Sequence, residues 1–263
     1  MFFVAVLRRR IASNRGQYNL HVYRSDTNGW STKLMYAPQN SAFLSTSKVI
    51  TIGGELGSVG WVDLWRGILI CDMLLDNKFR YISLPLPRVP KVLKGNPLIS
   101  RDIAVVKGYL KYIDMNLYIK PGSITEYINY TPDGWDAATW KMDLSKEDSN
   151  WEEGCKIETS EVPVNDLAYG QKLPKLQVGE DTESMLMRLH AGYPTLSLHE
   201  DDVVHIMNKV EIDEDLAWVF SIDMRRCTIK GLARFRSGRP VGHAFIFPES
   251  GISKHLGIWS YSR

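Results

Sequence analysis

The sequence predicts an all-β protein built from repeated antiparallel hairpins. Short apolar runs recur along the chain between turn-forming residues, which is the pattern typical of strands. Eight Trp and twelve Tyr residues favour sheets, on whose surfaces large aromatic side chains pack well. Helical periodicity is nearly absent. We expect at most one short helix, near residues 182–191, with Thr182 as N-cap and Gly192 as stop signal.

The predicted hairpins follow one another from the start of the chain. Residues 18–23 and 30–34 are expected strands on either side of a turn that contains Asn28-Gly29, a dipeptide favoured in hairpin turns. The apolar run at residues 1–7 also has the pattern of a strand. Further strands are expected at residues 59–63, 68–71, 79–84, 102–106, 109–113, 137–142, 151–157, 203–207, 217–222 and 228–232, about fourteen in all.

A weak internal repeat connects these hairpins. Four times an apolar run ends at an Asp and a large apolar residue follows a few positions later, in the pairs Asp26 to Trp30, Asp72 to Phe79, Asp143 to Trp151 and Asp223 to Ile229. The first Asp-to-Asp spacing, 46 residues, matches a propeller blade, whereas the next two, 71 and 80, require insertions. Because an Asp side chain accepts bonds from backbone amides two residues on, we interpret these carboxylates as architectural.

The repeat predicts one β-propeller-like domain over residues 1–263, with about four blades. A closed ring of six four-stranded blades needs about 24 strands, more than the sequence provides. We therefore expect an incomplete ring or a twisted stack of several sheets.

Charge is unevenly spread although the net charge is only +2. Residues 1–36 hold six basic and one acidic residue, residues 143–215 hold eighteen acidic and six basic, and residues 216–263 hold eight basic and two acidic. We interpret these blocks as neutralising one another on the folded surface. No segment concentrates Lys and Arg beside aromatic residues, so we expect no nucleic-acid partner.

Cysteine content and apolar runs indicate an intracellular protein. The three cysteines, Cys71, Cys155 and Cys227, are too few and too widely spaced for a zinc site. An odd number without a secretory signal favours reduced thiols, and we expect Cys71 and Cys227 to act as small buried apolar residues. No apolar run is long enough to cross a bilayer, so we expect no membrane association and a cytoplasmic or nuclear location.

Few residues qualify as a site. The run from His199 to His205 contains three consecutive carboxylates that can be considered as metal ligands, but a turn before a strand explains them more simply. The Gly53-Gly54 loop lacks the Lys and Ser/Thr of a phosphate loop. We therefore predict no catalytic, cofactor-binding or metal-binding residues and no cofactor. Four tryptophans allow two interpretations: Trp30, Trp61, Trp135 and Trp151. They line a recognition surface, or they pack between strands. We favour packing between strands.

Several long segments, in one order, resemble a plant family known as domain of unknown function 1618. They are residues 20–31, 60–72, 138–143, 194–207 and 217–224, and the resemblance spans about residues 18–235. The family is similar to the kelch-like domains that follow F-boxes. The resemblance implies a propeller-like fold in a plant cytoplasmic or nuclear protein, and it supplies no catalytic residues. Because family members have more chain before the first of these segments, we expect a truncated gene product or a shortened gene model.

These observations favour a non-catalytic domain that binds another protein through loops at one face. Two alternatives stay open. One is a hydrolase acting on a sugar or ester, with a pair of carboxylates in a central pocket. The other is a truncated paralogue without activity. Oligomeric state is not predicted.

Overall fold

The computed structural model describes residues 1–10, 16–75, 78–87, 95–124, 130–146, 148–164 and 182–236. Within these residues the chain forms fifteen strands and three short 3-10 helices. The strands are β1 (Phe3–Arg9), β2 (Gln17–Arg24), β3 (Gly29–Tyr36), β4 (Lys48–Gly53), β5 (Ser58–Asp63), β6 (Gly67–Asp72), β7 (Phe79–Ser83), β8 (Arg101–Val106), β9 (Tyr109–Ile119), β10 (Pro132–Asp143), β11 (Glu152–Glu158), β12 (His190–Leu196), β13 (Val203–Lys209), β14 (Leu216–Asp223) and β15 (Thr228–Arg236). The helices are η1 (Pro97–Ile99), η2 (Thr159–Glu161) and η3 (Thr182–Arg188).

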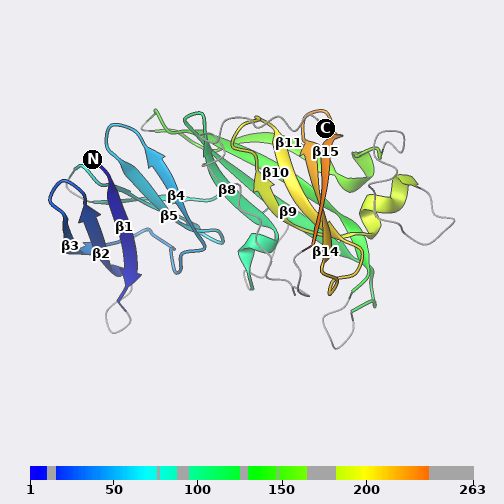
Figure 1. Cartoon of the computed structure of the whole chain (residues 1–263), viewed down its shortest axis with the longest axis horizontal. Coiled ribbons are helices and arrows are strands. Elements are labelled where there is room, and N and C mark those ends of the chain that lie inside the picture. Colours follow the sequence, from blue (N-terminus) through cyan, green and yellow to red (C-terminus); the bar gives the residue numbers. More distant parts are fainter. Residues whose placement is uncertain are drawn as a thin grey trace. The chain divides into compact units, whose positions relative to one another are not determined.

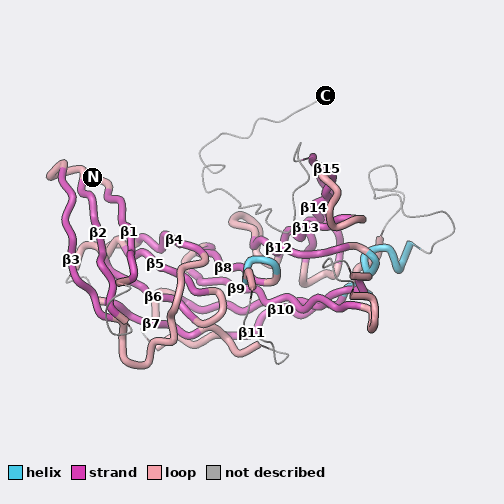
Figure 2. Tube along the Cα trace, turned by 90° about the horizontal axis from the view of Figure 1, so that it is seen from below, coloured by secondary structure: helices cyan, strands magenta, loops and turns pink. Residues whose placement is uncertain are grey.

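These strands form four antiparallel sheets, each made of strands consecutive in the chain (Figures 1 and 2). The first sheet has three strands in the order β1-β2-β3, and the other three have four strands each, β4 to β7, β8 to β11 and β12 to β15. The predicted all-β fold of repeated hairpins is confirmed, and every strand expected from the sequence is present.

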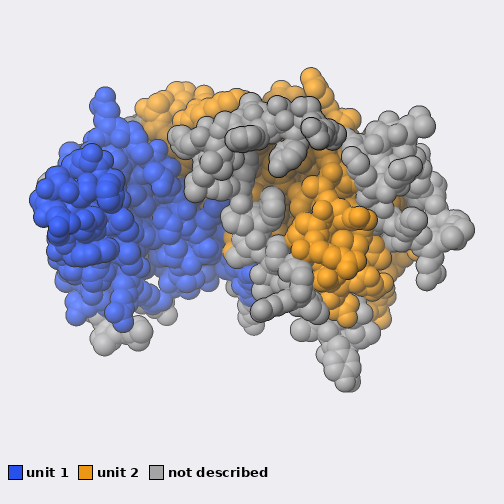
Figure 3. All heavy atoms as spheres, viewed as in Figure 1, with its two compact units in different colours: residues 1–97 blue, residues 98–263 orange. Residues whose placement is uncertain are grey.

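Two compact units divide the chain, residues 1–97 and residues 98–263 (Figure 3). In the first unit, the inner face of β1-β2-β3 contributes Tyr18, Leu20 and Met35 to a core that also contains Trp61 and Leu69 from the sheet β4 to β7. In the second unit, the sheets β8 to β11 and β12 to β15 share a larger apolar core. The expectation of one domain over residues 1–263 and of a propeller-like ring remains a prediction.

The repeated Asp marks the same position in the three four-stranded sheets and the last turn of the three-stranded sheet. Asp72, Asp143 and Asp223 end β6, β10 and β14, so each lies at the turn between the third and fourth strands of its sheet. Asp26 lies in the turn between β2 and β3, the second and third strands of the three-stranded sheet. If the Asp is used to align the sheets, β1, β2 and β3 correspond to the second, third and fourth strands of the others.

The architectural role of these carboxylates is visible in their hydrogen bonds. The Asp143 carboxylate accepts the amide of Ser145 at 2.9 Å, and the Asp223 carboxylate accepts the amides of Arg225 and Arg226 at 3.1 and 3.0 Å. Asp26 departs from the expected pattern, because it accepts the amide of the next residue instead. Asp72 also departs from it and accepts the hydroxyl of Ser58 across the β5–β6 pair.

Two strands and the end of the predicted helix differ from the sequence interpretation. The sequence did not predict β4 or β12. The helix near residues 182–191 is present as a 3-10 helix that ends at Arg188, and β12 begins two residues later at His190. Part of the insertion that the repeat spacing requires, residues 165–181, lies outside the described residues.

Candidate functional site

The three-stranded sheet has one face turned to the core and one turned outward. Its inner face carries the alternate side chains of Phe3, Ala5 and Leu7 on β1, which pack on the core of the first unit. The pairing register places Val4 opposite Tyr23 and Tyr23 opposite Trp30, and it places Val6 opposite His21. Because side chains in a strand alternate between faces, these residues share the outward side of the sheet.

That outward side is unusually apolar for an exposed surface. Trp30 and Tyr36 on β3 are each 61% exposed, as is Phe2 just before β1, and Val4 and Val6 are 45% and 47% exposed. Exposed apolar residues are ordinary when scattered singly, whereas an adjoining group on one face marks an interaction surface. The polar residues His21 and Thr32 divide this group, because they lie between Trp30 and the pair Leu34 and Tyr36. We refer to this group as the outer face, which comprises Phe2, Val4, Val6, Tyr23, Trp30, Leu34 and Tyr36.

An aromatic row crosses the strands at one end of the outer face. The ring of Tyr23 lies 6.1 Å from that of Phe2 and 5.6 Å from that of Trp30, measured between centroids. Tyr23 donates its hydroxyl proton to Asn28 at 2.7 Å. Asn28 has φ +49°, a left-handed conformation that Asn tolerates, so the predicted Asn-Gly turn also holds the aromatic row in place.

The outer face is bordered by positive charge. Arg8 on β1 is exposed and lies on the outward side, opposite Asn19. Arg24 pairs with Asp26 at 2.8 Å, and Asp26 is the only acidic residue among the first 36. The first three strands therefore present apolar side chains with an excess of basic ones.

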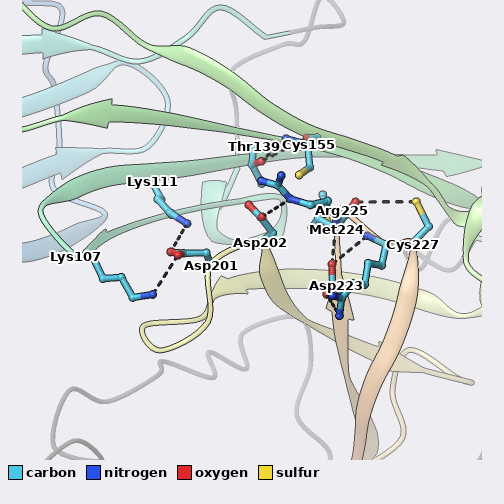
Figure 4. A network of polar contacts seen from close by, with 11 residues as sticks. Lys107, Lys111, Thr139, Cys155, Asp201, Asp202, Asp223, Met224, Arg225 and Cys227 are labelled. Carbon is cyan, nitrogen blue, oxygen red and sulfur yellow. Dashed lines mark hydrogen bonds and ion pairs between the residues drawn. The ribbon is translucent and has the colours of Figure 1, made fainter.

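The acidic run from His199 to His205 lies elsewhere, in the second unit, at the turn between β12 and β13 (Figure 4). Asp201 accepts hydrogen bonds from Lys107 at 3.1 Å and Lys111 at 3.0 Å. These contacts lower the pKa of the Asp201 carboxyl, the bond from Lys111 contributing most. The turn expected from the sequence is confirmed, because β13 begins only at Val203.

The other two carboxylates of the run are also engaged by basic groups. Asp202 accepts from Arg225 at 2.8 Å, and Glu200 pairs with Lys230. Acidic residues from the block 143–215 thus meet basic ones from the block 216–263, which is the neutralisation we expected. Among the described residues, no group of three His, Cys, Asp or Glu side chains is arranged to hold a metal ion.

These pairs border a small open cleft between the sheet β8 to β11 and the β12–β13 turn. Trp140, Leu196 and Val204 supply its apolar lining, and Lys111 and Asp201 lie at its side. The nearby Cys155 thiol has its pKa raised, first by burial and then by the negative charge of Asp202. A thiol of this kind is a poor nucleophile at neutral pH.

A buried polar row runs across β8, β9 and β10 in the same unit. Arg101 and Asp114 form an ion pair, and Asp136 accepts from the Asn116 amide at 2.8 Å and from the Tyr118 hydroxyl. This row contains two carboxylates on neighbouring strands of one sheet, whereas the hydrolase alternative requires a pair in a central pocket. Each carboxylate is held by donors from its own sheet, which suits a structural role as well as a chemical one.

A second small pocket lies beside β12 and β13 and is lined in part by Tyr130, His190, Tyr193 and Lys209. The rings of Tyr130 and His190 meet edge to face, with centroids 4.9 Å apart. Lys209 is only 8% exposed and donates to the carbonyls of Ile212 and Glu214 at 3.2 and 2.6 Å. Burial lowers the pKa of the Lys209 amine, and its two carbonyl contacts fix the loop after β13.

The structure separates the four tryptophans that the sequence grouped. Trp61 and Trp135 are each 2% exposed and belong to the cores of their units, so for them the packing interpretation is correct. Trp151 is half-buried and contacts Tyr112. Trp30 alone of the four is exposed. The apolar residues around it on β1 and β3 were not recognised as a site from the sequence.

A family model matches residues 61–205, more than half of the chain, from β5 into β13. The family is described as "Protein of unknown function (DUF1618)". The chain belongs to this family. The resemblance stated from the sequence is thereby confirmed, and a DUF1618 protein brings no assigned reaction with it. No curated protein matches the sequence. Among the described residues of this DUF1618 protein, none of the helices has the length and apolar character needed to cross a membrane.

Proposed function

We propose that this DUF1618 protein is a non-catalytic, intracellular interaction domain that binds another protein through the outer face of β1-β2-β3. The observation that carries the proposal is the group of exposed apolar and aromatic side chains there, Phe2, Val4, Val6, Trp30 and Tyr36. Aromatic residues are the usual anchors of protein interfaces, because a large rigid ring buries much area at little entropic cost. The interface that we propose is a sheet face, whereas the sequence had led us to expect loops.

The chemistry of the face selects the kind of partner. An apolar centre bordered by Arg8 complements a surface that is apolar with acidic residues at its rim. The one carboxylate within residues 1–36, that of Asp26, is already paired to Arg24. A strongly basic partner is disfavoured by the same charges. In the second unit, the acidic turn has its charges satisfied by Lys107, Lys111 and Arg225 and offers no comparable unpaired attraction.

The test compares matched baits. The full chain and its Trp30→Ser/Tyr36→Ser variant are used to capture proteins from cells that express it, and each recovered protein is then purified and titrated against both baits. Leu86→Ser serves as the control, since Leu86 is 87% exposed and lies outside the outer face. We expect binding by the full chain and the control, and a loss of at least about tenfold in affinity for the double variant.

All three baits are expected to unfold at similar temperatures, because surface substitutions of this kind change stability little. A purified partner that binds the double variant as tightly as the full chain would contradict the proposal. The hydrolase alternative would be favoured instead if the chain hydrolysed a sugar or ester substrate and the Asp114→Asn variant, still folded, did not.

A further inference from the structure

The open edge of β1 differs from the other sheet edges in its place in the repeat. Aligned by the turn Asp, β1 corresponds to β5, β9 and β13, the second strands of the other sheets. Each of those strands is paired on both sides. Of the strands that the structure describes, only β2 pairs with β1. A strand in an internal position therefore presents an open edge, and the position of a first strand beside it is empty in the described sheet.

The hydrogen-bond pattern shows which groups of β1 point toward that empty position. Ser25 donates to the carbonyl of Phe2 at 3.0 Å, and Arg10 donates to the carbonyl of Gln17 at 3.1 Å. Residue pairs in antiparallel strands alternate between bonded and non-bonded, so Val4, Val6 and Arg8 use their backbone groups on β2. The residues that alternate with them are Phe3, Ala5, Leu7 and Arg9. The backbone N–H and C=O groups of these four residues point away from β2.

Two of the usual protections of an edge strand, a proline and a bulge, are missing from β1, although Arg9 places one charge on its inner side. Natural proteins guard edge strands with prolines, bulges or inward-pointing charges. The β1–β2 register is unbroken over all seven residue pairs, and β1 contains no proline. Where the first strand of a sheet meets the second, the register is interrupted in β4–β5 and β12–β13 and unbroken in β8–β9.

We propose that the edge of β1 binds an extended segment of the partner protein as an added antiparallel strand, a mode in which backbone bonds supply affinity and alternate side chains supply specificity. This inference rests on the proposed function and names how the partner binds. Antiparallel addition is chosen because every described sheet is antiparallel.

The residues of β1 then specify the segment. On the outward side, the partner residue opposite Arg8 is acidic, since Arg8 is exposed and none of the ion pairs among described residues of the first unit involves it. The added strand runs antiparallel to β1. The partner residues two and four positions after the acidic one therefore lie opposite Val6 and Val4, and they are apolar. The two residues between these positions lie opposite Leu7 and Ala5 and make the backbone bonds.

The charge layout favours this occupant over a second copy of the chain. In an antiparallel pair of two β1 strands, each Arg8 faces an apolar residue of the other copy and gains no acidic partner. Residues 1–36 contain only one carboxylate, which Arg24 already binds. A partner segment with an acidic residue at the right position satisfies both the backbone edge and the Arg8 charge.

The experiment uses a fluorescent nine-residue peptide of alternating valine and threonine with one glutamate placed opposite Arg8, titrated against the full chain. A first control peptide has lysine in place of the glutamate. Two further peptides carry one N-methyl group each. In one, the methyl group is on the peptide residue opposite Leu7, and the amide of that peptide residue bonds β1. In the other, it is on the next peptide residue, and that amide points away from β1. We expect the first methyl group to weaken binding by about tenfold or more and the second by less than about twofold.

Two variants of the chain complete the test. Ala5→Pro removes an amide that faces the open edge without removing a bond to β2, so it should abolish peptide binding while the chain stays folded. Arg8→Glu should reverse the preference between the glutamate and lysine peptides, an effect that a merely structural role of Arg8 does not produce. In hydrogen exchange, bound peptide should slow the amides of Ala5 and Leu7 and leave that of Val6 unchanged.

Strand addition is overturned if the two N-methylated peptides bind equally well, or if the lysine peptide binds as tightly as the glutamate peptide. It is also overturned if the chain self-associates and Ala5→Pro abolishes that association, since a second copy is then the occupant. The proposed function is judged separately. If binding of a partner depends on Trp30 and Tyr36 but is unchanged by Ala5→Pro, strand addition is rejected and the outer-face interface is retained.

Discussion

Arg101 and Asp114 face each other across β8 and β9 and form an ion pair 2.9 Å long, from Nε to Oδ1, with each side chain only 1% exposed. Removing one member of a buried pair leaves the other charge in a medium that solvates it poorly. We expect Arg101→Met to lower the free energy of unfolding by about 3–5 kcal/mol. Urea denaturation of the variant and the parent measures this difference.

The double variant Arg101→Met/Asp114→Leu provides the control for that measurement. With both charges replaced by apolar side chains of similar size, most of the lost stability should return, because no uncompensated charge remains. A double variant that is less stable than Arg101→Met would show that the pair contributes chiefly through other contacts.

The turn carboxylates should differ in their contribution to stability according to the bonds they make. Asp223 accepts two backbone amides and is 9% exposed, whereas Asp26 accepts one amide in an exposed turn. We expect Asp223→Ala to cost about 1–3 kcal/mol and Asp26→Ala to cost less than Asp223→Ala. Equal losses in thermal unfolding experiments would argue against the bonds as the cause.

The pair of lysines on Asp201 predicts a small acid-dependent loss of stability. Because the folded pKa of Asp201 lies below its ordinary value of 3.8, the stabilisation is present above that pH and is lost as the pH falls below it. The groups are exposed, so the contribution at neutral pH is at most about 1 kcal/mol and is screened by salt. We expect Asp201→Asn to lower the melting temperature at pH 7 in low salt and to match the parent at pH 2.

The three thiols should separate by reactivity. Burial, with a smaller effect from Asp72, raises the pKa of the Cys71 thiol to about 11. At pH 8 we expect Cys71 to stay unmodified by a disulfide reagent in the folded chain and to react once the chain is denatured. Mass spectrometry of labelled peptides identifies the modified residue. Rapid labelling of Cys71 in the folded chain would contradict its burial.

Sequence reasoning recovered what is local in this fold. The Asn28-Gly29 turn and the turns at Asp143 and Asp223 were predicted because their causes lie within a few residues, whereas Asp72 bonds Ser58, fourteen residues away. Strand β12 was missed because it begins directly after a helix, contains Pro194 and has Tyr193 at φ +52°, features that obscure an alternating pattern. Cys227 was expected to be buried, but it sits half-buried in the β14–β15 turn with φ +52°.

The outer face was beyond local reasoning for a different reason. The run at residues 2–7 is apolar at every position, so the sequence does not show which side is covered. That choice is made by Tyr18, Leu20 and the sheet β4 to β7, which bury one side of β1-β2-β3 and leave the other. The exposure of Trp30 against the burial of Trp61 likewise depends on contacts between strands far apart in the chain.

The outer face is built from residues 2–36, whereas the family match begins at residue 61, inside β5. The matched sheets and the proposed recognition surface therefore lie in different stretches of the chain. The segment that defines the family can stay constant while the first three strands change. Relatives that share the matched sheets but differ in β1 and β3 are then expected to choose different partners, and exchanging residues 1–36 between two such proteins should exchange what they bind.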